Sequence, residues 1–361
     1  MNIDKNFNLQ DNITNNIKWI NPISSDRISI YGFNWIKEDR IYRRLPLSSF
    51  SKIEESCPKI NQLSNYTSGG QIHFWTNSKN LYLKAKIKDK ASVSLMSAIT
   101  QAGFDCYVGP NYDNLLFYNT ANFNVGTSEY QSKLFNNEVG KKLVVLNFPL
   151  YGAVEEVLLG IDDNSYVEKP NEFDSKGRIV IYGTSIIQGG CASRPGLSFT
   201  NILSRRLKRE FLNYGFSGNA FGEIEIANII ASIQNVKMFI LDYEANGGTD
   251  GKLALTLENF IKTIRLQNPG TPIVVMSRIK YLFDDLNKDL GKRRAKIRQF
   301  QIDMVKYFNN IGDHDVYFID GSKLLGKDYH EYTVDSIHPN DLGFMKIANN
   351  LEKKIKAILN E

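Results

Sequence analysis

The stretch IYGTSIIQGG, residues 181–190, decides how the chain is interpreted. It continues a short apolar run that begins at Arg178, and it precedes a long helix-like segment. Ser185 therefore lies where a strand gives way to a turn, two residues after Gly183. A hydroxyl residue in such a place is either a helix-capping residue or a catalytic nucleophile. The rest of the sequence has to separate these two interpretations.

From residue 177 onward the sequence alternates between strand-like and helix-like runs. The strand-like runs are short and apolar, whereas the helix-like runs carry apolar residues on one face. This alternation predicts a doubly wound α/β domain with a five-stranded parallel sheet. The expected strands are Arg178–Tyr182, Leu212–Phe216, Val236–Tyr243, Pro272–Ser277 and Val316–Asp320. The expected helices are Ser198–Phe211, Gly222–Ile233, Lys252–Gln267, Asp284–Asn310 and Asn340–Leu359.

The preceding half, Asn16–Ile161, consists of short alternating or apolar runs separated by turn residues, without long helical periodicity. Gln71–Lys88 alternates on both sides of a turn at residues 78–80, which predicts a β-hairpin. Lys141–Ile161 predicts two more strands. This pattern indicates an antiparallel β-sandwich or jelly roll. We expect this β-sandwich domain at residues 1–165 and the α/β domain at 177–361, joined by the polar linker Asp162–Gly177.

The composition is that of an ordinary globular protein, with 42% hydrophobic and 23% charged residues in a chain of 361. A net charge of +5 is too weak to indicate binding to nucleic acid or to a membrane surface. Three cysteines, Cys57, Cys106 and Cys191, do not imply a disulfide framework. The N-terminus lacks the apolar segment of a signal peptide, and no apolar run approaches the ~20 residues of a membrane span. We therefore expect a cytoplasmic protein.

Polar loops follow four of the five expected strands. Ser185 follows the first, Gly218 the second and Asn246 the third, while Asp335 and His338 follow the fifth after an intervening loop. Because the carboxyl ends of parallel strands meet at one edge of a sheet, we expect these residues to converge. Together they supply a nucleophile, a base, an orienting carboxylate and hydrogen-bond donors for an oxyanion. This set of groups points to serine acyl transfer.

These blocks resemble those of the SGNH (GDSL-type) hydrolases, whose order is Ser, Gly, Asn and Asp-x-x-His. The resemblance covers residues 177–361, and its last block matches as Asp335-Ser336-Ile337-His338. Thr184 stands where many members have Asp, and Glu244 and Gly247 replace the Gly and the Asp around Asn246. The resemblance implies a flavodoxin-like three-layer αβα fold.

The N-terminal half also resembles a known domain. AGFDCYVG, residues 102–109, is similar to the Gly-x-Asp-Leu-Tyr segment of a β-domain that precedes one bacterial subgroup of SGNH esterases, with Cys106 in place of the Leu. YRRLP, residues 42–46, and TSGGQIHFWTNS, residues 67–78, fit the same subgroup. The resemblance therefore implies a two-domain enzyme whose layout is similar to that of some carbohydrate esterases.

The resemblance and the chemistry of the residues imply the same roles. Ser185 is expected to attack an ester carbonyl, with His338 as its base and Asp335 orienting the imidazole. The backbone N–H groups of Ser185 and Gly218 and the side-chain amide of Asn246 would bind the oxyanion. We expect hydrolysis of short acyl esters, acetyl above all, of a polar or saccharide substrate, without a cofactor. An acyltransferase and a catalytically degenerate carbohydrate-binding protein remain alternatives.

Several charged and nucleophilic residues have structural alternatives. Arg194 and Glu244 are candidates for substrate binding, although a surface charge and a partner of Asn246 are equally consistent interpretations. Cys191 is expected to be a small packing residue. Among the carboxylates near residue 244, no His/Cys set has metal-ligand spacing, so no metal is expected. Of the remaining histidines, His73 and His314 are expected to be structural or exposed, whereas His330 is an alternative candidate for the base. The natural substrate and the oligomeric state stay open.

Overall fold

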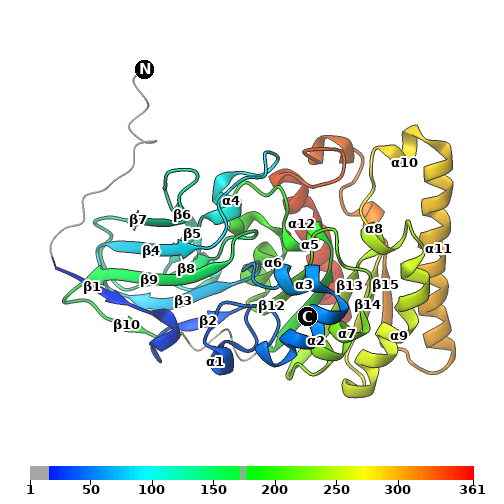
Figure 1. Ribbon diagram of the computed structural model, residues 1–361, viewed down its shortest axis with the longest axis horizontal. Coiled ribbons are helices and arrows are strands. Elements are labelled where there is room, and N and C mark those ends of the chain that lie inside the picture. The colour runs from blue at the N-terminus through cyan, green and yellow to red at the C-terminus, as the bar shows by residue number, and fades with distance from the viewer. Residues whose placement is uncertain (1–15, 171–172, 174–175) are drawn as a thin grey trace.

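The computed structural model describes residues 16–170, 173 and 176–361, which form an antiparallel β half and an α/β half (Figure 1). Our expectations for residues 1–15, and for the part of the linker at 171–172 and 174–175, lie outside the described residues. Across the described ranges, none of the helices combines the length and the apolar character needed to span a membrane.

The β half consists of two antiparallel sheets whose facing sides enclose one apolar core. Its eight strands β1 and β3–β9 follow the strand order of a jelly roll, so the predicted fold of this half is confirmed. In order, the first sheet is β1 (Ile17–Ile20), β9 (Val154–Asp162), β4 (Leu81–Ile87) and β7 (Glu129–Phe135). The second sheet is β10 (Val167–Glu168), β3 (Gln71–Thr76), β8 (Lys142–Asn147), β5 (Asp105–Gly109) and β6 (Leu116–Thr120), with β2 (Ser29–Tyr31) also paired to β3.

The hairpin predicted at residues 71–88 is wrong, although both of its strands exist. β3 pairs with β2, β8 and β10, whereas β4 pairs with β7 and β9 in the other sheet. The turn therefore crosses from one sheet to the other, and the Asp162 carboxylate accepts hydrogen bonds from the N–H groups of Lys79 (2.9 Å) and Asn80 (3.1 Å). Alternation specifies which side chains face a core, and it does not specify which strand lies alongside.

Short helices interrupt the jelly roll, and four of them are α-helical. They contribute few residues to its core, which explains why the sequence showed no long helical period. These helices are α1 (Ile36–Asp39), α2 (Phe50–Ser56), α3 (Pro58–Leu63) and α4 (Ala98–Ala102).

The α/β half is built on a five-stranded parallel sheet of order β12-β11-β13-β14-β15. This is the flavodoxin-like order, and helices cover both faces, so the predicted three-layer fold is confirmed. The strands are β11 (Arg178–Gly183), β12 (Glu210–Gly215), β13 (Val236–Asp242), β14 (Ile273–Met276) and β15 (Val316–Ile319). One face is covered by α7 (Ile224–Ala231), α9 (Lys252–Gln267) and α11 (Lys288–Asn310), and the other by α5 (Ser185–Gln188), α6 (Phe199–Leu207) and α12 (Asp341–Leu359).

Two of the expected helices differ most from the structure. The helix expected to run to Phe211 ends at Leu207, because Lys208 adopts a left-handed conformation (φ 53°) and β12 begins at Glu210. The helix expected at residues 284–310 is divided into α10 (Phe283–Leu286) and α11. Asn287 separates them, since its extended backbone ends the first helix and its side chain caps the second.

The jelly roll packs against the segment that follows the first strand of the α/β half. Asp105, whose side chain is fully buried, accepts a hydrogen bond from Arg194 at 2.8 Å. The Ser68 hydroxyl donates to the Gln188 carbonyl at 2.7 Å, and the Gly32 N–H donates to Glu210 at 2.8 Å. The first two contacts join the halves beside the segment that carries Ser185, whereas Glu210 lies at the opposite, amino-terminal end of the strands.

Candidate active site

Ser185 is the first residue of the short helix α5, directly beyond the carboxyl end of β11. Gly183 of β11 lies in register with Gly215 of β12 and Asp242 of β13 on its two sides. The loops after these three strands therefore leave the sheet at the same edge. β11 is also the strand at which the chain order reverses, which is where ligands bind in sheets of this kind.

Ser185, His338 and Asp335 form a continuous hydrogen-bonded chain. Ser185 Oγ lies 2.8 Å from His338 Nε2, and His338 Nδ1 lies 2.7 Å from Asp335 Oδ2. The histidine and aspartate side chains are each about one-quarter exposed, at 26% and 24%. The structure thus brings together the three residues that the sequence predicted as nucleophile, base and orienting carboxylate.

A tight local turn presents Asp335 and His338 to the serine. Asp335 Oδ1 accepts hydrogen bonds from the N–H groups of Ile337 (3.0 Å) and His338 (2.7 Å), and Ser336 has a left-handed backbone (φ 70°). Burial raises the pKa of Asp335, but the hydrogen bonds from the His338 backbone and side chain outweigh it, so the net pKa lies below its usual value. The carboxylate is therefore ionised at neutral pH.

Gly218 and Asn246 lie in the loops after β12 and β13, on either side of Ser185. Gly218 has a left-handed backbone (φ 69°), and the space where a Cβ would project is open. Asn246 is part of α8 (Glu244–Gly247). Its hydrogen-bonding partners orient the amide so that Oδ1 accepts from the N–H groups of Asn219 (3.1 Å) and Ala220 (3.0 Å). This orientation leaves the two Nδ2 donors for another acceptor.

The loops that carry these residues are also joined to α5. The Ser217 N–H donates to Gln188 Oε1 at 3.0 Å, and Gln188 Nε2 donates to the Leu150 carbonyl of the jelly roll at 3.1 Å. Within the described residues, the N–H groups of Ser185 and Gly218 make no hydrogen bond to the protein. Ser185 has this free donor because it begins a helix.

Tyr151 is a residue of the jelly roll that the sequence did not identify. Its hydroxyl lies 3.4 Å from the Ser185 carbonyl and would lie 2.7 Å from a Cβ at position 190, which is glycine. Burial raises the pKa of this phenol, so it remains protonated. The sequence places Tyr151 between the two strands predicted within Lys141–Ile161, but it does not show that this segment packs onto α5.

The two residues considered for substrate binding are occupied elsewhere, which corrects that prediction. Arg194 donates to Asp105 and to the Tyr107 hydroxyl at 2.7 Å, and its guanidinium lies 3.7 Å from the ring centre of Phe117. Arg194 therefore connects the α/β half to the jelly roll.

Glu244 is 2% exposed, and its carboxylate is hydrogen-bonded within the protein. Its carboxylate accepts from the Arg278 N–H at 2.9 Å and from the Gln301 side chain at 2.8 Å. Arg294 Nε lies 3.8 Å from its other oxygen. Buried among these donors, Glu244 fixes α8 to α11 and has no access to a substrate.

The other candidate nucleophile and bases lie in unsuitable surroundings. Burial, followed by the charge of Asp335, raises the pKa of Cys191 to about 11, so its thiol is not activated. Burial lowers the pKa of His73 to about 3. His330 is on the surface beside Glu331, 3.5 Å away. Among the residues described, no three His, Cys, Asp or Glu side chains group together as metal ligands.

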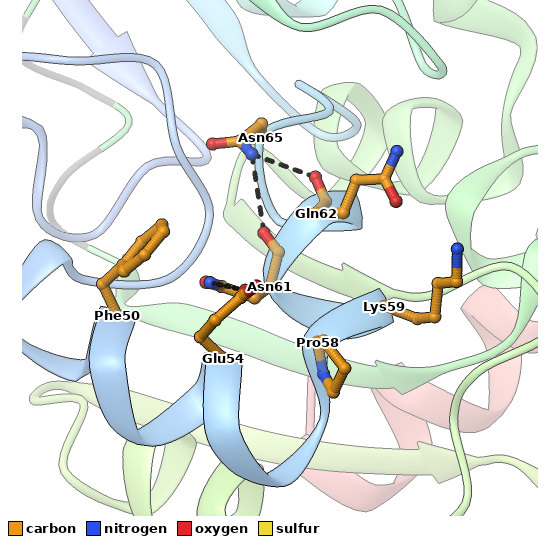
Figure 2. Close-up of a pocket in the computed structure, with 7 residues that line it drawn as sticks. All are labelled: Phe50, Glu54, Pro58, Lys59, Asn61, Gln62 and Asn65. Atoms are coloured by element: carbon orange, nitrogen blue, oxygen red, sulfur yellow. Dashed lines mark hydrogen bonds between the residues drawn. The ribbon is translucent and has the colours of Figure 1, made fainter.

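Two recesses lie beside the helices α2 and α3. One, of about 390 Å³, is next to the loop that follows Gly218 and is lined on that side by Asn219, Phe221, Glu223 and Lys252. The other, of about 330 Å³, lies between α2 and α3 and is lined by the residues drawn in Figure 2. The larger recess is connected to the candidate site through Asn219, which lines the recess and whose N–H binds Asn246 Oδ1.

Two family profiles match the chain. The profile of the GDSL-like lipase/acylhydrolase family matches residues 176–356, half of the chain. The chain belongs to this family. Residues 17–167 match the GxDLY profile, which describes the N-terminal part of SGNH-type esterases. Membership in the GDSL-like family makes the protein an ester-cleaving enzyme, and both halves of the predicted resemblance are confirmed.

Solved structures of the GDSL-like fold cover nearly the whole chain. A GDSL-like lipase from Bacteroides ovatus shares 27% identity at a TM-score of 0.86, covering 96% of this chain and 98% of that one. A salicylyl-acyltransferase from a tetracycline biosynthetic pathway shares 20% identity at a TM-score of 0.79, with the same coverage. A family two carbohydrate esterase from Clostridium thermocellum, in complex with cellohexaose, shares 15% at a TM-score of 0.59, covering 81% and 93%. A search of curated protein sequences finds no match.

Proposed function

We propose that the protein is a serine esterase that removes short acyl groups, acetyl among them, from a polar or saccharide alcohol. The observation that carries this proposal is the line of hydrogen bonds from Ser185 Oγ through His338 to Asp335, at 2.8 Å and 2.7 Å. Such a line is the arrangement in which an imidazole can take the proton of an attacking hydroxyl.

The proposed reaction begins when Ser185 Oγ attacks the ester carbonyl carbon and its proton moves to His338 Nε2. Asp335 stabilises the resulting imidazolium through the hydrogen bond at Nδ1. Collapse of the tetrahedral intermediate breaks the ester C–O bond, and His338 returns the proton to the departing alcohol. Water then attacks the acyl-serine by the same route, which releases the carboxylic acid and restores Ser185.

The negative charge that develops on the carbonyl oxygen needs donors already in place. We assign this role to the N–H groups of Ser185 and Gly218 and to Asn246 Nδ2. Their support is the shared sheet edge, the two unused backbone donors, and the amide orientation set by Asn219 and Ala220. Donors held in advance stabilise the transition state without reorganisation.

The surface beside the site is suited to an ester of a polar alcohol. The 390 Å³ recess is lined by Asn219 and Lys252 next to an aromatic residue, Phe221. Glu223 also lines it, but its carboxylate accepts hydrogen bonds from the Tyr182 hydroxyl and the Phe221 N–H. Hydrogen-bonding groups around an aromatic ring are suited to a sugar. The similar carbohydrate esterase from Clostridium thermocellum was crystallised with cellohexaose, which supports the same substrate class.

Hydrolysis of p-nitrophenyl acetate by the wild type, Ser185→Ala and His338→Ala tests the mechanism. We expect the wild type to turn over and each variant to lose at least about 10³-fold in kcat, because the two residues act as one unit. Acyl esters from acetate to octanoate then measure the preferred chain length, which we expect to be short. An inert wild type would favour a carbohydrate-binding protein, and an active Ser185→Ala would remove the assigned nucleophile.

Acyl transfer is the second candidate, favoured by the similarity to the salicylyl-acyltransferase. The same acyl-serine would then react with an alcohol in place of water. Turnover of p-nitrophenyl acetate in the presence of increasing glycerol or methyl glucoside distinguishes the two outcomes. We expect acetate as the main product, whereas a dominant acetylated alcohol at millimolar acceptor would identify a transferase.

A further inference from the structure

Arg44 is a jelly-roll residue whose side chain reaches into the α/β half. It is 1% exposed, the largest of the fully buried side chains in the described chain. Its Nη1 donates to the carbonyl oxygens of Gly215 (2.6 Å) and Asn213 (3.0 Å), both in β12. Its Nη2 donates to the Leu63 carbonyl at 2.7 Å, at the end of α3. Arg44 is therefore hydrogen-bonded to the carboxyl end of β12, a strand of the α/β half.

The carboxyl end of β12, which Arg44 binds, leads directly into the loop that carries Gly218. Phe216, the first residue of this loop, lies under the guanidinium, with 4.8 Å between Arg44 Cζ and the ring centre. Its N–H donates to the Gly183 carbonyl at 2.8 Å, two residues before Ser185. Gly218 itself has no neighbour within 4 Å of a Cβ position. Its N–H is held in place by anchored neighbours on both sides. Phe216, which contacts Arg44, and Ser217 precede it, and Asn219, whose N–H binds Asn246, follows it.

The charge of Arg44 has no carboxylate partner among the described residues, since its bonds go only to carbonyl groups. Burial lowers the pKa of the guanidinium to about 9, so the group stays positive at neutral pH. Packing alone does not require such a group, because a charge is costly to bury without a counter-charge. A fixed positive charge behind the donors of an oxyanion is favourable when negative charge develops there.

We infer that Arg44 is a positioning residue for the oxyanion hole, acting across the domain interface on the segment Gly215–Gly218. This inference rests on the proposed esterase function. It assigns the jelly roll a direct part in catalysis, because the strand end that precedes a catalytic donor is held by its side chain.

Arg43 provides a matched control one residue away. It is also buried, at 3% exposed, but its guanidinium binds Asn61 and Asn65 in its own half. Figure 2 shows these two asparagines on and after α3, with Phe50 of α2 beside them. Arg43 thus matches Arg44 in residue type, burial and chain position, and differs in having no hydrogen bond to the α/β half among the described residues.

The test compares Arg44→Met, Arg44→Lys and Arg43→Met in the full-length protein, with folding checked by circular dichroism. On p-nitrophenyl acetate we expect Arg44→Met to lower kcat by about 10- to 100-fold, since a small misplacement of a catalytic donor has effects of this size. KM should stay within about threefold, and Arg44→Lys should recover part of kcat. Arg43→Met should stay within about twofold of the wild type, as expected for a residue outside the positioned segment.

An alkylboronic acid adds a readout that a structural role would not change. Its tetrahedral adduct with Ser185 resembles the charged intermediate, so its affinity should fall in parallel with kcat in the Arg44 variants. Equal kcat in Arg44→Met and Arg43→Met would overturn the inference, as would a loss confined to KM. So would failure of both Arg44 variants to fold, which would make the residue a stability element. An inactive wild type would instead overturn the proposed function.

Discussion

Asn246 has one structural role and one proposed catalytic role in the same side chain. Its Oδ1 binds the backbone N–H groups of Asn219 and Ala220, and so connects the loops after β13 and β12. The same bonds turn Nδ2 away from that loop and fix it as a donor. The residue is therefore held on one side and chemically free on the other, which is what a preorganised oxyanion donor requires.

Substituting Asn246 separates these two roles. In Asn246→Asp the retained oxygen still accepts from both N–H groups, while the donor is replaced by a charged acceptor. We expect both Asn246→Asp and Asn246→Ala to lose about 10²- to 10³-fold in kcat, the usual effect of removing one oxyanion donor. The measurement is kcat on p-nitrophenyl acetate beside the thermal midpoint. An Asn246→Asp enzyme that kept half its activity would contradict the assignment.

At the residue scale, the sequence contained most of the candidate site. Ser185, Asp335 and His338 were predicted from strand ends and spacing, and the structure places them in one hydrogen-bonded line. Arg194 and Glu244 were misjudged because their exposure was unknown. A charged residue near a catalytic loop has the same sequence pattern whether it meets solvent or a buried partner.

At the scale of elements, β3 contains a titratable group that faces the interior. His73 is 1% exposed, hydrogen-bonded to the Tyr112 hydroxyl (3.0 Å) and to Gln71 (3.2 Å). Burial lowers its pKa from 6.5 to about 3. The unfolded chain therefore binds a proton near pH 6.5, whereas the folded chain binds it only near pH 3. The stability that depends on this neutral imidazole is complete above pH 6.5 and is lost as the pH falls toward 3.

This difference predicts how the protein responds to acid. Between pH 7 and pH 5, His73 should remove about 2 kcal/mol from the free energy of unfolding. Urea unfolding at both pH values, for the wild type and for His73→Gln, isolates the contribution. We expect the pH dependence to be smaller in the variant by this amount. Equal pH dependence in the two proteins would show that His73 is not the responsible group.

The elements that were predicted well differ physically from those that were not. α9 begins and ends where expected, at Lys252 and Gln267, because a turn and a proline-containing stop bound an apolar stripe. The β3–β4 hairpin was wrong because both strands have an apolar inner face, and that face is the same whether the strands pair or lie in opposite sheets. The local sequence pattern therefore predicted which face of a strand is buried, but it did not predict which strand it pairs with.

At the scale of the whole molecule, the interface between the halves depends on Asp105. Its carboxylate accepts from Arg194 (2.8 Å), from the Gly196 N–H (2.7 Å) and from Asn147 Nδ2 (2.6 Å). Asp113 offers a contrast, since it pairs with Lys208 across the same two halves but is 68% exposed. Asp105 therefore makes a buried contact between the halves, whereas Asp113 makes a solvent-exposed one.

Replacing each carboxylate by alanine measures this contrast. Asp105→Ala should reduce the free energy of unfolding by about 3–5 kcal/mol, because it removes the counter-charge of the largely buried Arg194 and the acceptor of two other donors. Asp113→Ala should have little effect, as is usual for exposed ion pairs. Urea unfolding provides both values. Similar small losses in the two variants would mean that Asp105 does not hold the halves together.

The inter-domain contacts are the part of the molecule that the sequence could least predict. Tyr151 and Arg44 lie in segments that were recognised as belonging to the β half, yet their partners are more than 30 residues away in the other half. Periodicity and spacing describe how an element faces its own core. They do not describe how two folded domains pack against each other.

The chain order of the jelly roll has a consequence for synthesis on the ribosome. All of its strands lie between Ile17 and Glu168, and β11 begins only at Arg178. A nascent chain therefore holds every strand of the jelly roll before it holds the first strand of the α/β sheet. Arg44 and Asp105 are then already placed when β12 and the Ser185 loop emerge, so the later half can assemble against a surface that is already complete.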